Sequence, residues 1–146
     1  MRAREGERLC EDMLLKLKNI SDLVTIVEKR SPETVREYRE RLEARLCELL
    51  DDRGVDEQRL ITEAALFADK TAVDEETVRL RSHIAQFGSM LEDGSPIGRK
   101  MDFLMQEFNR ESNTIGSKCS DAALAKVVVE LKSEIEKLRE QLQNVE

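Results

Sequence analysis

The sequence has few of the residues that build sheets, disulfide scaffolds or membrane spans. Aromatic residues make up 3% of its 146 residues and tryptophan is absent, so the aromatic and β-branched runs that strands need are scarce. Its three cysteines are widely spaced and odd in number, which excludes a disulfide framework and a paired zinc-ligand motif. A membrane span needs about 20 apolar residues in a run, and no such run occurs. We therefore expect an all-α, cytoplasmic protein with reduced thiols and no membrane contact.

The charge of the chain is acidic. Its 31 acidic and 24 basic residues give a net charge of -7. This balance argues against a surface coated in basic residues for nonspecific nucleic-acid binding, so any contact with a polyanion has to be local. An acidic surface does permit divalent cations, which carboxylate oxygens bind.

Apolar residues recur at alternating spacings of three and four through most of the chain, as they do on amphipathic helices. This periodicity predicts one domain over residues 1–146, a bundle of about five helices joined by short turns. A helix over residues 5–29 is expected to end before Ser31-Pro32, a pair that starts the next helix, which runs to about residue 50. Alternating charges over residues 33–45 are expected to form a solvated face. Asp51-Asp52-Arg53-Gly54 is then a turn.

Two later segments complete the predicted bundle. Ser95-Pro96 is expected to start a helix that ends around Gly116, and its core stripe consists of Ile97, Met101, Leu104, Phe108 and Ile115. The last segment keeps apolar residues at strict heptad spacing from Leu124 to Val145, which predicts a long C-terminal helix. Such a heptad stripe either packs inside the bundle or coils with a second copy of the chain.

A polar face on the penultimate helix is the best candidate site. Its members share helical spacing opposite the core stripe, and we call them the amide face: Arg99, Asp102, Gln106, Asn109, Asn113 and the adjoining Arg110. Asparagine is a poor helix former because its side chain competes for the backbone. Two explanations stay open: the face grips a ligand by directional hydrogen bonds, or it forms a polar network against another helix.

His83 is the only histidine and stands in line with Glu76 and Arg79 on one helix. It could be a general acid or base, a metal ligand, or a partly exposed residue at the edge of the core. Glu76 and His83 are seven residues apart, or about 10 Å along a helix, so they need other elements or a water to share a metal. The acidic start of this helix, Asp74-Glu75-Glu76, is also explained by favourable interaction with the helix dipole.

The longest motif in the chain carries a family resemblance. It runs from Gly98 to Thr114, and it is accompanied by Ser117-Lys118, Glu130 to Lys132, Ile135-Glu136, Glu140 to Glu146, Ala68 to Lys70, Asp74 to Glu76 and Arg79 to His83. Together these segments closely resemble the YicC-like family of bacterial endoribonucleases. The resemblance covers essentially all of the present chain but only the C-terminal half of the family's members.

This resemblance implies metal-dependent cleavage of RNA in the bacterial cytoplasm by homo-oligomers, expected to be hexamers. The metal would be Mn²⁺ or Mg²⁺. The positions that match the family's polar motifs are Glu76, His83, Asp102, Gln106, Glu107, Asn109, Arg110, Glu111 and Asn113.

Phosphodiester cleavage needs an activated oxygen nucleophile, positive charge near the phosphate and a proton for the leaving oxygen. The catalytic candidates are Glu76, His83, Glu107 and Glu111. The candidate metal ligands are Glu76, His83, Asp102 and Glu107. Arg99, Arg110 and Lys118 could hold phosphates. Gln106, Asn109 and Asn113 could bond ribose hydroxyls or base edges, and Phe103 could stack on a base.

The competing hypothesis is a non-catalytic module of amphipathic helices that oligomerises or docks RNA. On that hypothesis the amide face cements helices together. The enzyme hypothesis carries its own condition, because an acidic half-protein should bind RNA poorly unless the preceding half supplies positive charge. The isolated chain could therefore be inactive.

Overall fold

The computed structural model describes residues 2–51, 54–94, 96 and 98–145, and over these residues the chain is helical, with no strand. The all-α prediction is confirmed. The helices are α1 (Arg2–Leu50), α2 (Glu57–Thr71), α3 (Asp74–Glu92), α4 (Arg99–Lys118) and α5 (Ala122–Val145). Asp52, Arg53, Ser95 and Ile97, predicted above as turn, cap and core residues, lie outside the described part of the chain. None of the described helices is long and apolar enough to cross a bilayer.

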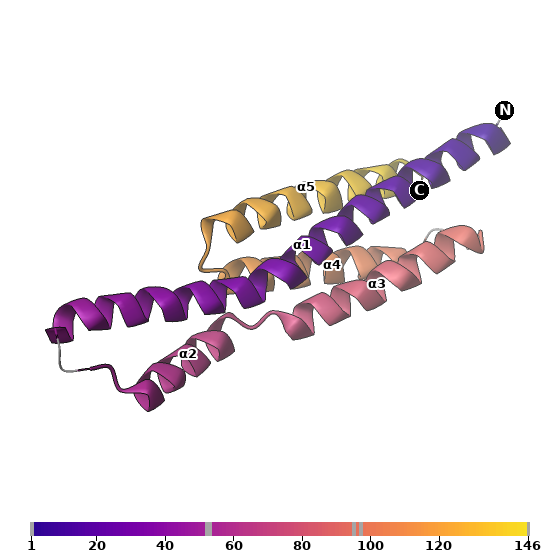
Figure 1. The fold of residues 1–146 in the computed structure, drawn as a ribbon. Helices are drawn as coiled ribbons and strands as arrows, with labels where there is room; N and C mark the ends of the chain where they lie inside the picture. The colour runs from indigo at the N-terminus through magenta and orange to yellow at the C-terminus, as the bar shows by residue number, and fades with distance from the viewer. Residues whose placement is uncertain (1, 52–53, 95, 97, 146) are drawn as a thin grey trace.

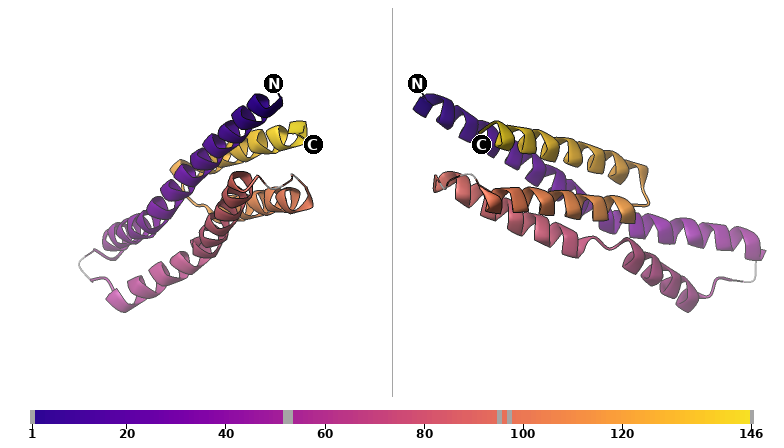
Figure 2. Two further views of the ribbon diagram at one scale, coloured as in Figure 1. Left: turned by 90° about the vertical axis from the view of Figure 1, so that its right-hand side faces the viewer. Right: turned by 180° about the vertical axis from the view of Figure 1, so that it is seen from behind.

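The helices form a bundle with an arm (Figures 1 and 2). The first half of α1 packs together with α3, α4 and α5. The second half of α1, residues 33–50, runs on beyond the ends of α4 and α5 and is accompanied by α2. We call the arm the part of the chain made up of residues 33–50 of α1 and the whole of α2. The candidate site residues on α3 and α4 therefore belong to the bundle and not to the arm.

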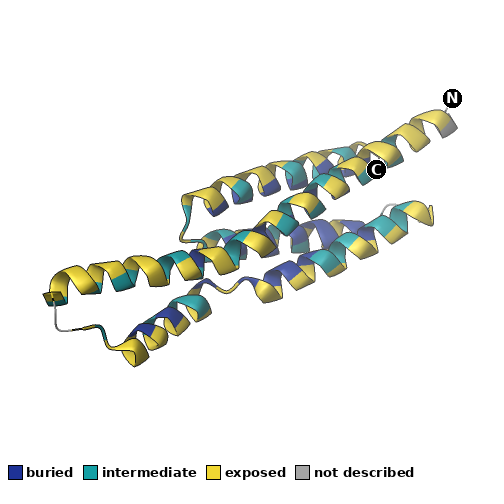
Figure 3. Ribbon diagram, in the orientation of Figure 1, coloured by how far each residue is buried: buried dark blue, intermediate teal, exposed yellow. Residues whose placement is uncertain are grey.

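The core follows the predicted stripes. Met101, Leu104, Phe108 and Ile115 of α4 are buried, and the Phe108 ring lies 6.0 Å from the ring of Phe87 between centroids. On α5 the heptad residues from Leu124 to Leu142 are buried against the same chain. Figure 3 shows buried residues on the faces that the bundle helices turn toward one another. From Leu124 to Leu142 the heptad stripe thus packs inside the bundle, whereas Val145, its last predicted member, is exposed.

Two predicted helix starts are wrong. The pair Ser31-Pro32 does not start a helix, because α1 continues through Pro32. Proline removes one backbone N–H from a helix interior, but buried side chains on both sides, Val27 and Thr34, hold the two halves in the fold. The second error concerns Ser95-Pro96, which was predicted to start a helix. Gly98 is extended and α4 begins only at Arg99, so Pro96 precedes the helix.

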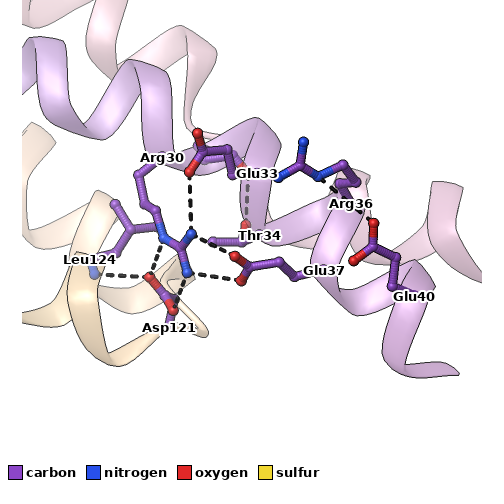
Figure 4. A network of polar contacts seen from close by, with 9 residues as sticks. Arg30, Glu33, Thr34, Arg36, Glu37, Glu40, Asp121 and Leu124 are labelled. Carbon is purple, nitrogen blue, oxygen red and sulfur yellow. Dashed lines mark hydrogen bonds and ion pairs between the residues drawn. The ribbon is translucent and has the colours of Figure 1, made fainter. Parts of the chain in front are cut away.

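Arg30 links α1 to the start of α5 (Figure 4). Its guanidinium binds both carboxylate oxygens of Asp121, at 2.9 and 3.0 Å, and both of Glu37, at 2.8 and 2.9 Å. Asp121 also accepts a hydrogen bond from the Leu124 N–H and so caps α5. The hydrogen bonds from Arg30 lower the pKa of Asp121 and of Glu37. Glu37 is thus part of a cross-helix network, which corrects the prediction that all charges over residues 33–45 are merely solvated.

We expect Arg30→Met to lower the urea midpoint of unfolding, because Asp121 and Glu37 would lose their shared cation next to the proline. Arg36→Met is the matched control. Arg36 is exposed, its nearest carboxylate oxygen, on Glu40, is as far as 4.0 Å away, and exposed ion pairs contribute little to stability. Circular dichroism at increasing urea measures both variants. Equal midpoints for the two variants would contradict a structural role for the Arg30 network.

Candidate functional site: the α3–α4 seam

The four predicted catalytic residues meet where α3 packs on α4. Glu76 and His83 come from α3, and Glu107 and Glu111 come from α4. The two helices run in opposite directions, so residues early in α3 face residues late in α4 (Figure 1). We call this contact line the α3–α4 seam, and it consists of Glu76, Arg79 and His83 on α3 and Glu107, Glu111 and Lys118 on α4.

One end of the seam is a chain of paired charges, in which the Glu76 Oε2 atom is nevertheless buried without a hydrogen-bond partner among the described residues. Glu76 and Glu111 are each 3% exposed. The Lys118 ammonium lies 2.8 Å from the Glu76 carboxylate, and it also donates to the carbonyl of Ala72 at 3.1 Å. The Arg79 Nε lies 2.8 Å from the Glu111 carboxylate, and its Nη2 lies 3.7 Å from Glu76. A buried carboxylate is costly unless it is paired, so these pairs hold the two helices together.

These pairs also decide the protonation of Glu76. Burial is the largest single influence on the Glu76 carboxyl and raises its pKa, but the hydrogen bond from Lys118, a backbone hydrogen bond at Glu76 and the charges of Lys118 and Arg79 together lower the pKa below its usual value. The hydrogen bond to Glu111 likewise raises the pKa of Arg79. Glu76 therefore stays ionised at neutral pH and is unsuited to be a general acid. Lys118, which was expected to hold a phosphate, already has two partners inside the chain.

The other end of the seam has polar atoms without partners. His83 Nε2 lies 3.8 Å from Glu107 Oε2, and the two side chains are 15% and 18% exposed. This distance is too long for a hydrogen bond and suits a bridging water or cation. Among the described residues, neither ring nitrogen of His83 has a hydrogen-bond partner. The His83 ring packs edge-on against Phe108, with centroids 6.3 Å apart, so its orientation is set by the core.

His83 and Glu107 are candidate ligands that do not form a closed metal site. Adjacent ligands of an octahedral ion with bonds of about 2.1 Å lie about 3.0 Å apart, so the two side chains, now 3.8 Å apart, would have to move closer to share one ion. The four predicted metal ligands do not converge: within the described ranges, no three His, Cys, Asp or Glu side chains are grouped to hold one ion. Glu76 is bound by Lys118, and Asp102 is exposed on the outside of α4. Two of the predicted ligands, His83 and Glu107, therefore remain candidates, and Mg²⁺ and Mn²⁺ commonly take further ligands from water and phosphate oxygens.

The amide face of α4 is open. Arg99, Asp102, Gln106, Arg110 and Asn113 are exposed and Asn109 is half-buried. The side-chain amides of Gln106, Asn109 and Asn113 make no hydrogen bonds to other described residues. The side-chain hydrogen bonds found on α3 and α4 are made by other groups. The interpretation of this face as a polar network between helices therefore does not hold within the chain.

The amide face and the seam meet on α4. Phe103, Glu107 and Arg110 follow one another at i, i+4 and i+7, so they form one row along the helix. Phe103 and Arg110 are exposed, and Arg110 Nη1 lies 4.0 Å from Glu107 Oε1.

The sequence places Arg79 beside Glu76, but no role was predicted for Arg79. Its pairing with Glu111, 32 residues away, had no local signal that could have revealed it.

Comparisons with known proteins identify the family of the chain. Residues 27–146 match the family described as "Endoribonuclease YicC-like, C-terminal". The chain is 49% identical over its whole length to a "Probable endoribonuclease YicC" of Clostridioides difficile, and 40% identical to the protein of the same name from Haemophilus influenzae. It spans about half the length of these two relatives, 50% in each case. The chain belongs to the YicC-like endoribonuclease family.

The charge compensation at Glu76 predicts a pH dependence of stability. Because the pKa of Glu76 is lowered on folding, its contribution is present above its unfolded pKa, about 4.3, and is lost as pH falls through the lower folded value. We expect Glu76→Gln to be less stable than the wild type at pH 7, and this difference to shrink toward pH 3.

Urea unfolding at several pH values between 3 and 7 measures the difference. Glu75→Gln is the control, since Glu75 is exposed. A difference between Glu76→Gln and the wild type that is constant over this pH range would show that Glu76 is not held ionised by its partners.

Proposed function

We propose that this chain is the C-terminal helical domain of a divalent-metal-dependent endoribonuclease, with its reaction site at the His83–Glu107 end of the α3–α4 seam. The observation that supports this most is the pair itself. A buried imidazole with two unpartnered nitrogens lies 3.8 Å from a carboxylate, next to an exposed face of arginine and amide groups. Such atoms are costly inside a protein, so a ligand-binding role explains why they are there.

The seam supplies groups for two needs of phosphodiester cleavage, a metal ligand set and a phosphate-binding cation. His83 would hold the metal with Glu107 through Nε2, and because a nitrogen bound to a cation cannot also carry the transferred proton, the proton at the reacting oxygen would be exchanged with water. The guanidinium of Arg110, exposed beside Glu107, would bind a non-bridging phosphate oxygen. A Mg²⁺ or Mn²⁺ ion held by His83 and Glu107 would supply positive charge to the phosphate. Glu76 and Glu111 act in this proposal by positioning Lys118 and Arg79.

The amide face would orient the RNA around this site. Amide groups of Gln106, Asn109 and Asn113 can both donate and accept, which suits ribose 2′-hydroxyls and base edges. Arg99 would hold a further phosphate. We place this reaction in the cytoplasm, because Cys10, Cys47 and Cys119 are all free thiols.

Cleavage of labelled RNA by the full-length protein in Mn²⁺ tests this proposal. We expect His83→Gln to lower the cleavage rate at least about tenfold, because the metal would lose one of the two ligands that the chain offers, with the urea midpoint nearly unchanged. Glu130→Gln, an exposed carboxylate on α5, should cleave as the wild type does. The proposal fails if the wild type does not cut RNA, or if His83→Gln cuts at the wild-type rate.

A second function, self-association, is favoured by the surface of the arm. Leu60 and Ala64 of α2 are buried, but Leu49 at the end of α1 and Ile61 and Leu66 on α2 are exposed. Exposed apolar groups that gather in one part of a protein are typical of interaction surfaces. We propose that the arm contributes to a homo-oligomer, with the hexamer implied by the family resemblance as its expected size.

Mass measurement by light scattering separates the two roles. We expect Leu49→Glu combined with Leu66→Glu to reduce the assembled mass, because charges would be buried at the interface. Asn109→Ala combined with Arg110→Ala should keep the mass and reduce RNA cleavage. If the amide-face variant dissociates and the arm variant does not, the amide face is assembly surface and the proposed enzyme site is wrong.

A further inference from the structure

Phe103 is placed differently from the other phenylalanines of the chain. Phe87 and Phe108 are fully buried, and Phe67 stacks on Tyr38 with ring centroids 4.0 Å apart and planes parallel to within 1°. Phe103 is 56% exposed, and its ring pairs with no other aromatic ring among the described residues. In a chain with so few aromatic residues, one ring is thus held at the surface with its face available.

This ring borders a shallow groove between α3 and α4. Gln86, Ser89 and Met90 line the groove from α3, and Lys100 and Phe103 line it from α4. The groove therefore combines an aromatic ring and a flexible thioether with one amide, one hydroxyl and one cation. Gln86 donates its Nε2 to Ser82 at 3.3 Å, which orients the amide and leaves its oxygen as an acceptor.

That combination matches a nucleobase more closely than other ligands. A base is a flat ring with donors and acceptors on its edge, and it is joined to an anionic phosphate. The ring of Phe103 can stack on the base, and Lys100 can pair with the phosphate. The amide oxygen of Gln86 can accept a hydrogen bond from the edge of the base, and so can the hydroxyl of Ser89, whose own hydrogen is donated to Asp93 at 3.4 Å. The groove also lies close to the reaction site, because Phe103 precedes Glu107 by about one helical turn, or about 6 Å along the axis.

We propose that this groove binds one unpaired nucleobase of the RNA, stacked on Phe103, with Lys100 against the adjoining phosphate. A base paired within a duplex cannot present its face to the ring, so the groove selects single-stranded segments. The inference rests on the proposed function, since it names the part of the RNA that the same α3–α4 region takes up.

The absence of tryptophan gives a direct probe. Phe103→Trp places a single tryptophan of this chain at the groove, and Leu15→Trp is the matched control on α1, because Leu15 is also 56% exposed. In the full-length protein, any tryptophan of the preceding half is replaced by phenylalanine in both variants. Each variant is titrated with a single-stranded oligouridylate carrying 2′-O-methyl groups, and with an abasic phosphodiester chain of equal length and charge.

We expect the oligouridylate to quench Phe103→Trp fluorescence and the abasic chain to leave it nearly unchanged, since stacking needs a base. Leu15→Trp should respond to neither. The inference would be overturned if the abasic chain quenched Phe103→Trp fluorescence as much as the oligouridylate does. It would also be overturned if oligouridylate quenched Leu15→Trp as much as Phe103→Trp.

Binding measurements on Phe103→Leu separate stacking from hydrophobic packing. Loss of one aromatic stack weakens single-strand binding about 5- to 150-fold, and we expect this loss for Phe103→Leu but not for Phe103→Tyr. If the wild type cleaves RNA and Phe103→Leu binds single strands as tightly as Phe103→Tyr, the groove inference fails alone. If oligouridylate selectively quenches Phe103→Trp but the wild type cleaves no RNA, the proposed function fails alone.

Discussion

The packing of α3 on α4 depends on buried carboxylates that are compensated by cations of the opposite helix. Glu76 and Glu111 are almost fully buried, and each would destabilise the fold if it were ionised without a partner. Lys118 of α4 reaches Glu76 of α3, and Arg79 of α3 reaches Glu111 of α4. Because the two pairs run in opposite directions across the interface, they fix the register of the helices. That register in turn brings His83 beside Glu107.

The two ends of this interface serve different purposes. At the Lys118 end nearly every charge has a partner inside the chain, so this end contributes to stability. At the His83 end the polar atoms have no such partners, and the exposed row of Phe103 and Arg110 adjoins them. A site that binds an external ligand needs rigid support and open polar groups together. The α3–α4 seam provides the support at one end, and at the other the buried nitrogens of His83 lie on the seam beside the exposed side chains of Arg110 and Phe103.

The sequence predicted what local periodicity determines. The core positions Met101, Leu104 and Phe108 and the heptad stripe of α5 follow directly from apolar spacing, since burial requires those faces. Pro32 was misjudged because a proline signal is local, whereas the continuation of α1 depends on tertiary contacts on both sides of it. The cluster of Glu76, His83, Glu107 and Glu111 was anticipated only as a set of candidates. Their pairing depends on helix register, and no spacing within one helix contains that information.

In the function proposed above, metal and RNA meet at the His83 end of the seam. A crystal structure of the full-length protein with Mn²⁺ and a non-cleavable RNA tests this most directly, because manganese is located by its anomalous scattering. We expect manganese between His83 and Glu107, with a phosphate of the RNA against Arg110. Manganese and RNA bound together at another place, with His83 and Glu107 contacting neither, would contradict the account.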